Sequence, residues 1–153
     1  MRPCRLAAMS SISAELIAAY RRTEYRVADG SYAFVLRIDE SSDSLRTCHA
    51  AFGVECSAFV TAWNPRSEPT PLDANEAAMA RLEAEIESRG LFALRGVGVD
   101  PAGDWPGEPS LLVLGLDAEP ACALARTFDQ HAIVCASEDA TPRLVVVAPV
   151  SGR

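Results

Sequence analysis

The segment Cys56–Trp63 constrains the fold more than any other part of the chain. It is an almost unbroken apolar run of strand length, and a strand that is apolar on both alternating faces is typically covered on both sides. The next segment, Asn64–Leu72, contains three prolines and is predicted to be a loop. Thr61–Pro65 therefore marks the point where a buried central strand opens into a loop, and such positions often carry function.

The rest of the chain alternates between helical and extended patterns. Helices are predicted over about 10–22, 41–53, 73–89 and 119–128, and strands over 24–28, 32–38, 56–63, 91–99, 110–116, 132–136 and 144–147. We expect an α+β fold: a single layered domain over 10–150, with a mostly antiparallel sheet of about six to seven strands packed with three to four helices. Residues 1–9 are interpreted as a ragged leader.

The helix over 73–89 shows the strongest helical pattern. Asp73 is predicted to cap it and Glu76 to reach back in a capping-box arrangement, while Gly90 ends it. Asn75 lies in the first turn and is expected to be exposed. Its amide has two open roles, which are to hold a ligand or to fasten the preceding loop.

Charge and residue usage exclude several functions. The net charge of −7 argues against a general electrostatic grip on nucleic acid, and the arginines near the N-terminus are interpreted as a solvated helix face. All fourteen basic residues are arginine. A lysine Schiff base, a pyridoxal-phosphate anchor and a Walker-type phosphate loop are therefore excluded.

Cysteine and histidine usage gives no sign of a metal centre. The five cysteines include no C-x-x-C pair, and there are only two histidines. Cys48 and His49 are adjacent in a predicted helix and point about 100° apart, so they cannot pair directly. We predict no metal and no cofactor. Reduced thiols and the lack of an apolar run of about 18 residues indicate a cytoplasmic protein without a membrane partner.

The remaining polar and aromatic residues cluster where predicted elements end. The candidate ligand-binding residues are Tyr20, Tyr25, Trp63, Asn64, Arg66, Asn75, Trp105, Ser110 and Gln130, with Glu108 as the candidate catalytic group. An alternative stays open: both tryptophans could be packing residues, and Asn64, Glu108 and Gln130 could satisfy loop backbone groups.

A set of ordered motifs marks a family resemblance. The motifs are Tyr20-x-x-Thr23-x-Tyr25, Ala58–Pro65 with Ser67, Asn75, Gly98-x-Asp100-Pro101-x-Gly103-x-Trp105-Pro106, Glu108-Pro109-Ser110 and Phe128-x-Gln130-x-Ala132-Ile133-Val134. In these the chain resembles a bacterial family known only as domain of unknown function 3293. Two departures occur, Asp129 in place of a glycine and His131 in place of an asparagine. The resemblance implies a fold but no established activity.

Two main hypotheses about function follow, and weak nucleic-acid contact through the N-terminal arginines is a third possibility. In the first, a small polar molecule binds between Trp63 and Trp105, with Glu108 as an acid or base in a semi-enclosed loop and Arg66 or Arg21 as an anion clamp. Asn64, Asn75 and Gln130 would donate and accept hydrogen bonds, and Tyr20 and Tyr25 would close one side. Whether such a protein is an enzyme is left open. In the second hypothesis, the tryptophan loops form the contact surface of a protein-interaction or regulatory module.

Overall fold

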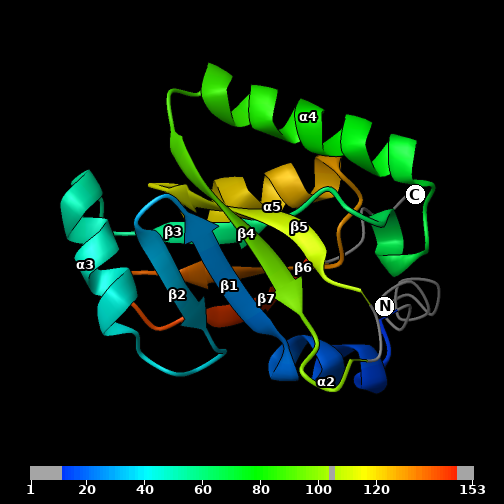
Figure 1. Cartoon of the computed structure of the whole chain (residues 1–153), viewed down its shortest axis with the longest axis horizontal. Helices are drawn as coiled ribbons and strands as arrows, with labels where there is room; N and C mark the ends of the chain where they lie inside the picture. Colours follow the sequence, from blue (N-terminus) through cyan, green and yellow to red (C-terminus); the bar gives the residue numbers. More distant parts are fainter. Residues whose placement is uncertain (1–11, 104–105, 148–153) are drawn as a thin grey trace, which may run out of the picture.

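The computed structural model describes residues 12–103 and 106–147, which form a seven-stranded sheet with helices packed around it (Figure 1). The strand order is β2-β1-β4-β5-β3-β6-β7, and every pairing is antiparallel. The strands are β1 Glu24–Asp29, β2 Tyr32–Leu36, β3 Ser57–Val60, β4 Phe92–Val99, β5 Glu108–Leu114, β6 Ala132–Ala136 and β7 Arg143–Val146. The predicted α+β class is confirmed.

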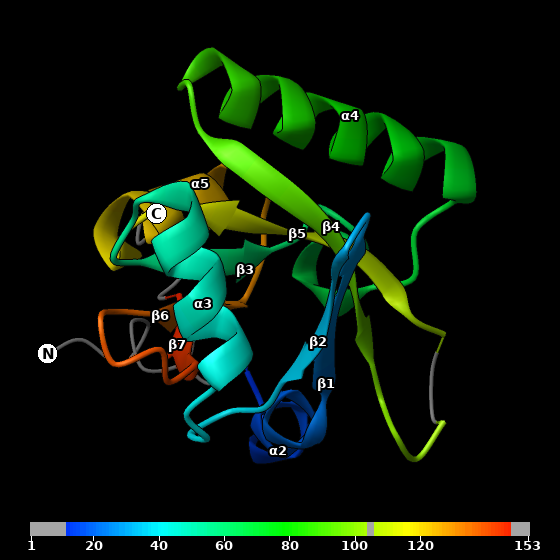
Figure 2. The same ribbon diagram turned by 60° about the vertical axis from the view of Figure 1, so that its left-hand side comes forward.

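The described residues contain four α-helices and one short 3-10 helix. They are α2 Ala14–Arg22, α3 Asp43–Phe52, η1 Pro65–Ser67, α4 Leu72–Ser88 and α5 Ala118–Thr127. Figures 1 and 2 both show α2 on the side of the molecule opposite α4. The predicted leader over 1–9 lies outside the described residues.

β3 has the central, doubly covered position that its sequence predicts, although it spans only four residues. Ala58 and Val60 join a core that includes residues of α4 and α5, whereas Phe59, between them, joins a second core that includes Leu45 of α3. The alternation of side chains along a strand sends neighbours to opposite faces. Because both faces are covered, all four residues of β3 are buried; three are apolar, and the hydroxyl of the fourth, Ser57, is 2.8 Å from His49 Nε2.

Both ends of α3 are capped by residues of types that favour these positions. The Ser42 hydroxyl accepts the backbone N–H of Leu45 at 3.0 Å, and Gly53 ends the helix in the left-handed conformation with φ 68°. The N-cap of α2 is Ser13, whose hydroxyl accepts the N–H of Leu16 at 3.0 Å.

The predicted cap of α4 is wrong. The helix begins at Leu72, and the residue at its N-cap is Pro71, which makes no side-chain capping bond. Asp73 lies inside the first turn, and its carboxylate accepts only the N–H of Ala74, at 2.8 Å. The φ of −57° at Pro71 already suits the start of a helix, so the helix begins two residues earlier than a cap at Asp73 would allow.

Within 12–103 and 106–147, no helix combines the length and the apolar character needed to cross a lipid bilayer.

Candidate functional site

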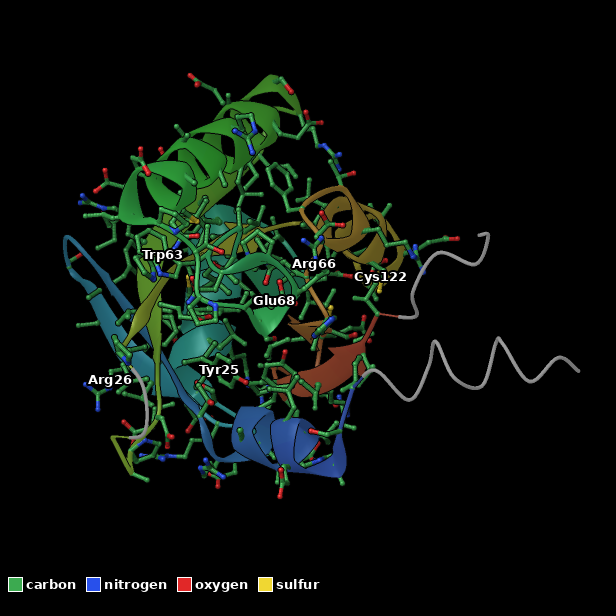
Figure 3. The ribbon with its side chains drawn as sticks, turned by 90° about the vertical axis from the view of Figure 1, so that its right-hand side faces the viewer. Tyr25, Arg26, Trp63, Arg66, Glu68 and Cys122 are labelled. Carbon is green, nitrogen blue, oxygen red and sulfur yellow. The ribbon has the colours of Figure 1, made fainter. Side chains whose placement is uncertain are left out.

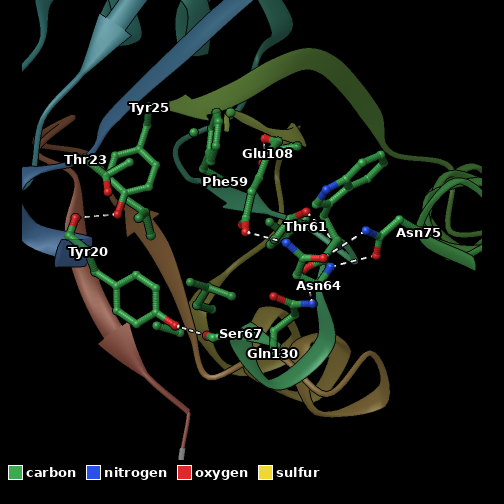
Figure 4. Close-up of a pocket in the computed structure, with 18 of the residues that line it drawn as sticks. Tyr20, Thr23, Tyr25, Phe59, Thr61, Asn64, Ser67, Asn75, Glu108 and Gln130 are labelled. Carbon is green, nitrogen blue, oxygen red and sulfur yellow. Dashed lines mark hydrogen bonds between the residues drawn. The ribbon is translucent and has the colours of Figure 1, made fainter. Parts of the chain in front are cut away.

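A cavity of about 540 Å³ opens beside the C-terminal end of β3, in the range of small-molecule pockets. Its walls come from α2, β1, the loop between β3 and α4, the start of β5 and the segment that enters β6 (Figure 4). The polar lining residues include Tyr20, Thr23, Tyr25, Thr61, Asn64, Ser67, Thr70, Asn75, Glu108, Ser110 and Gln130, and the apolar or aromatic ones include Phe59, Val60, Trp63, Ile133 and Leu144.

The loop that follows β3 is held in an unusual backbone conformation. Asn64, Arg66 and Ser67 have φ angles of 47°, 58° and 60°, a left-handed region that costs a residue with a side chain about 1 to 2 kcal/mol. The backbone N–H of Arg66 donates to the carbonyl of Asp129 at 2.7 Å, which anchors the loop to the corner before β6. Strain concentrated in this way is frequent at ligand sites.

Asn75 fixes the position of Asn64. The Asn75 side-chain oxygen accepts the backbone N–H of Asn64 at 2.8 Å, and its Nδ2 donates to Asn64 Oδ1 at 2.9 Å and to the carbonyl of Thr70 at 3.3 Å. Asn75 is buried, so the expectation of an exposed asparagine is wrong. Of the two roles left open for its amide, it performs the fastening of the loop.

Glu108, the first residue of β5, faces this arrangement. Its Oε2 accepts a hydrogen bond from Asn64 Nδ2 at 3.2 Å (Figure 4). Burial raises the pKa of the Glu108 carboxyl above its usual value, and the hydrogen bond from Asn64 opposes that rise. The result is a partly desolvated carboxyl whose orientation is set by an amide that is itself fixed.

Tyr20 and Tyr25 form the side of the cavity nearest α2. The Tyr25 hydroxyl donates to the carbonyl of Tyr20 at 2.6 Å, and the Tyr20 hydroxyl and the Ser67 hydroxyl are 2.9 Å apart. Burial raises the pKa of both phenols, and the negative charge of Glu108 adds to that rise. The two rings and the carboxyl therefore lie within electrostatic reach of one another.

Three further predicted residues line the cavity and also support its backbone. Gln130 Nε2 donates to the carbonyls of Trp63 at 3.2 Å and Phe128 at 3.3 Å. The Ser110 hydroxyl donates to the carbonyl of Glu108 at 3.0 Å. Trp63 packs against the core formed with α4 and α5. Packing and backbone satisfaction, the alternative that the sequence left open, thus account for part of what these residues do.

The structure does not bring the two candidate anion clamps to the cavity. Arg66 lies in the loop with its guanidinium 3.3 Å from Asp129 and 4.0 Å from Glu68 (Figure 3), and Arg21 pairs with Asp39 at 3.0 Å. Neither arginine lines the cavity. Trp105, proposed as the second aromatic wall, lies outside the described residues.

The sequence did not single out Thr61, Thr23 or Phe59 as individual site residues. The Thr61 hydroxyl donates to the carbonyl of Pro109 at 2.7 Å and accepts the N–H of Trp63 at 3.0 Å, which joins the end of β3 to β5. A threonine in an otherwise apolar run was the available signal. Thr23 is buried, and its hydroxyl donates to the carbonyl of Ala19 at 2.7 Å.

The Cys48–His49 pair lies away from the cavity. Both residues are buried, and His49 Nε2 is 2.8 Å from the hydroxyl of Ser57. Burial lowers the pKa of His49, which favours its neutral form. Over the part of the chain that the structure describes, no three His, Cys, Asp or Glu side chains gather as a metal site would require.

The fold and the cavity define an α+β protein with a carboxyl-bearing pocket at the end of its central strand. Residues 60–133 match the model of a family described as protein of unknown function (DUF3293), the family that the sequence motifs resemble. Comparison with curated proteins and with solved structures gives no match. The corner residue Asp129 has φ 56°, a conformation in which the glycine expected from the resemblance would be free of strain.

Proposed function

We propose that this protein binds a small polar molecule in the cavity beside β3, with Glu108 as the group that exchanges a proton or pairs with the ligand. One observation carries the proposal: Tyr20, Asn64, Glu108 and Gln130 come from four separate stretches of the chain and line the same cavity. Packing alone does not require polar groups from distant segments to meet in a partly desolvated space, where each must find a partner.

The apolar walls and few fixed polar groups also support a small ligand over a protein partner. A cavity of about 540 Å³ is large enough for a metabolite. Asn64 presents its amide from a strained loop that Asn75 and Asp129 hold in place, and a pre-formed site loses less entropy on binding.

A thermal-shift screen of metabolites on matched variants tests this proposal. Asn64→Gly removes the amide at a position where φ is 47°, and Arg66→Gly makes an equivalent backbone change at φ 58° without altering the cavity lining. We expect ligands that raise the melting temperature of the wild type and of Arg66→Gly but raise that of Asn64→Gly much less. A screen without hits, or hits that stabilise Asn64→Gly equally, contradicts the proposal.

Catalysis is tested on whichever ligand binds. If Glu108 transfers a proton, Glu108→Gln loses turnover even at ligand concentrations that saturate the variant, as followed by NMR of the ligand. If the protein is instead an interaction module, we expect a stable complex with a protein partner that survives Asn64→Gly and no metabolite that shifts the melting temperature.

A further inference from the structure

The polarity of the cavity indicates the chemical class of the ligand, given the small-molecule function proposed above. Among the described residues that line the cavity, Glu108 is the only one with a formal charge, and no arginine or histidine is included. A lone carboxylate in a partly desolvated space has no protein cation to offset its charge. A positively charged group on the ligand would supply that offset.

The hydrogen-bond donors around the cavity are already engaged within the protein. Asn64 Nδ2 donates to Glu108 and Asn75 Nδ2 to Asn64, while Gln130 Nε2 donates to two carbonyl oxygens. These bonds fix which way each amide points. Asn64 in particular accepts from the N–H of Thr70 at 3.1 Å, so its amide cannot flip without losing that bond.

Acceptors, in contrast, remain in excess. The Oε1 atoms of Glu108 and Gln130 receive no hydrogen bond within residues 12–103 and 106–147. A ligand that enters this cavity therefore meets acceptors that need protons and few donors that can give them. Ligands rich in acceptors, such as carboxylates or phosphates, would leave both their own oxygens and the acceptors of the cavity without hydrogen bonds.

The aromatic side of the cavity suits the same kind of ligand. The rings of Tyr20 and Tyr25 line it, and Tyr25 packs edge-on against Phe59 with ring centroids 5.3 Å apart (Figure 4). The face of an aromatic ring attracts a cation that lies within about 6 Å. The apolar surface contributed by Val60, Ile133 and Leu144 would cover an uncharged body.

We propose that the natural ligand carries a cationic nitrogen, an ammonium or amidinium-type group, on a mostly apolar body, and that this nitrogen pairs with the Glu108 carboxylate. The nitrogen donates hydrogen bonds to Glu108 Oε1, and the body lies against the tyrosine side of the cavity. Asn64 acts as a positioning residue, since it sets the direction of the carboxylate without contacting the cation.

Four probes that share a phenyl body and differ in charge test this inference. Benzylamine and benzamidine are cationic, benzyl alcohol is neutral and benzoate is anionic; each is titrated at neutral pH and low salt with ligand-observed NMR. We expect both cations to bind about tenfold or more tightly than benzyl alcohol and benzoate, since a partly buried charge pair contributes at least about 1.4 kcal/mol.

Two variants that remove the same charge locate the effect. Glu108→Gln keeps an oxygen for Asn64 Nδ2 and is expected to remove the preference for the cations. Glu138→Gln changes an exposed residue remote from the cavity lining and is expected to retain the preference. A two-dimensional NMR spectrum that matches that of the wild type checks that each variant is folded. The titrations of the wild type test the inference even if a variant does not fold.

Equal or tighter binding of benzyl alcohol or benzoate overturns the inference, as does an unchanged preference in folded Glu108→Gln. Absence of binding by all four probes at millimolar concentration also overturns it. In each of these cases the broader proposal survives if the metabolite screen yields a neutral or anionic ligand that depends on Asn64.

Discussion

The Asn75 side chain makes two hydrogen bonds to Asn64, one of 2.8 Å from the backbone N–H of Asn64 and one of 2.9 Å to the side-chain oxygen of Asn64. This pair of bonds lets a residue with φ 47° present its Nδ2 to Glu108 at 3.2 Å. The orientation of the cavity carboxyl thus depends on a residue of α4 that has no bond to it.

Asn75→Ala is expected to lower the free energy of unfolding by about 2 to 3 kcal/mol, because it removes three hydrogen bonds at a buried position and leaves partners unsatisfied. Urea denaturation at pH 7 measures this loss. Glu76→Ala, at the next and exposed position of α4, is the control and is expected to change stability by less than about 0.5 kcal/mol. Equal effects of the two substitutions would contradict the role of Asn75.

Gly96 and Gly98 lie two residues apart in β4 and should respond differently to an added methyl group. A Cβ at Gly96 would lie 2.5 Å from the carbonyl of Arg26 and 2.8 Å from the ring of Phe59, whereas a Cβ at Gly98 would meet only a methyl of Thr23 at 3.7 Å. Gly96→Ala is expected to destabilise the fold by about 1 to 3 kcal/mol. Gly98→Ala should be close to neutral in the same denaturation experiment, and the reverse order would contradict this packing.

The corner residue Asp129 offers a test of the backbone strain. Asp129→Gly and Asp129→Ala both remove the exposed ion pair with Arg66 and differ in their tolerance of φ 56°. The glycine variant is expected to be the more stable of the two by about 1 kcal/mol, as judged from midpoints of chemical denaturation. If alanine is equally stable, the left-handed conformation at this corner does not carry the cost assigned to it.

Glu108 should make stability depend on pH in the direction opposite to that of a salt-bridged carboxylate. Its pKa is raised in the folded protein, so the folded state holds the proton more tightly than the unfolded chain. The stability linked to this proton is full below the unfolded pKa and is lost as pH rises through the folded pKa. The free energy of unfolding of Glu108→Gln minus that of the wild type should therefore be larger at pH 7 than at pH 4.

Urea denaturation of wild type and Glu108→Gln at both pH values measures that gain, with Glu138→Gln as the control for overall charge. A carbon-13 titration of the Glu108 carboxyl gives the pKa directly. A wild-type midpoint at or below the usual glutamate value would contradict the assigned burial. Asn64→Gly should move the midpoint further upward, since Asn64 stabilises the charged form.

Local signals in the sequence were sufficient for most of the fold. The hairpin of β1 and β2 turns at an Asp29-Gly30 pair, and α3 lies between a serine cap at Ser42 and Gly53; such signals are local, because a turn or a cap depends on residues within a few positions. The start of α4 was misplaced for a related reason. A capping pattern at Asp73 competes with the fixed φ of Pro71, and the pattern alone does not decide between them.

The arrangement of the site depended on tertiary pairing that local patterns do not encode. Asn64, Glu108 and Gln130 were recognisable as polar residues at the ends of elements, but the contact of Asn64 with Glu108 follows from the pairing of β3 with β5. The same applies to Arg66. The sequence predicts an anion clamp at Arg66. In the structure Arg66 has a left-handed backbone conformation, and its guanidinium lies beside Asp129.

The contacts of Asn64 also imply an order of assembly during folding. Its bond to Asn75 closes a separation of 11 residues, whereas its bond to Glu108 closes 44 and the bond between Gln130 and Trp63 closes 67. Loop closure over the longer spans costs about 1 to 2 kcal/mol more in chain entropy. The bonds between Asn64 and Asn75 can therefore form while the loop contacts only α4. Glu108 and Gln130 come into contact with the loop later. Substitutions at Asn75 should slow refolding, and substitutions at Glu108 should mainly change the unfolding rate.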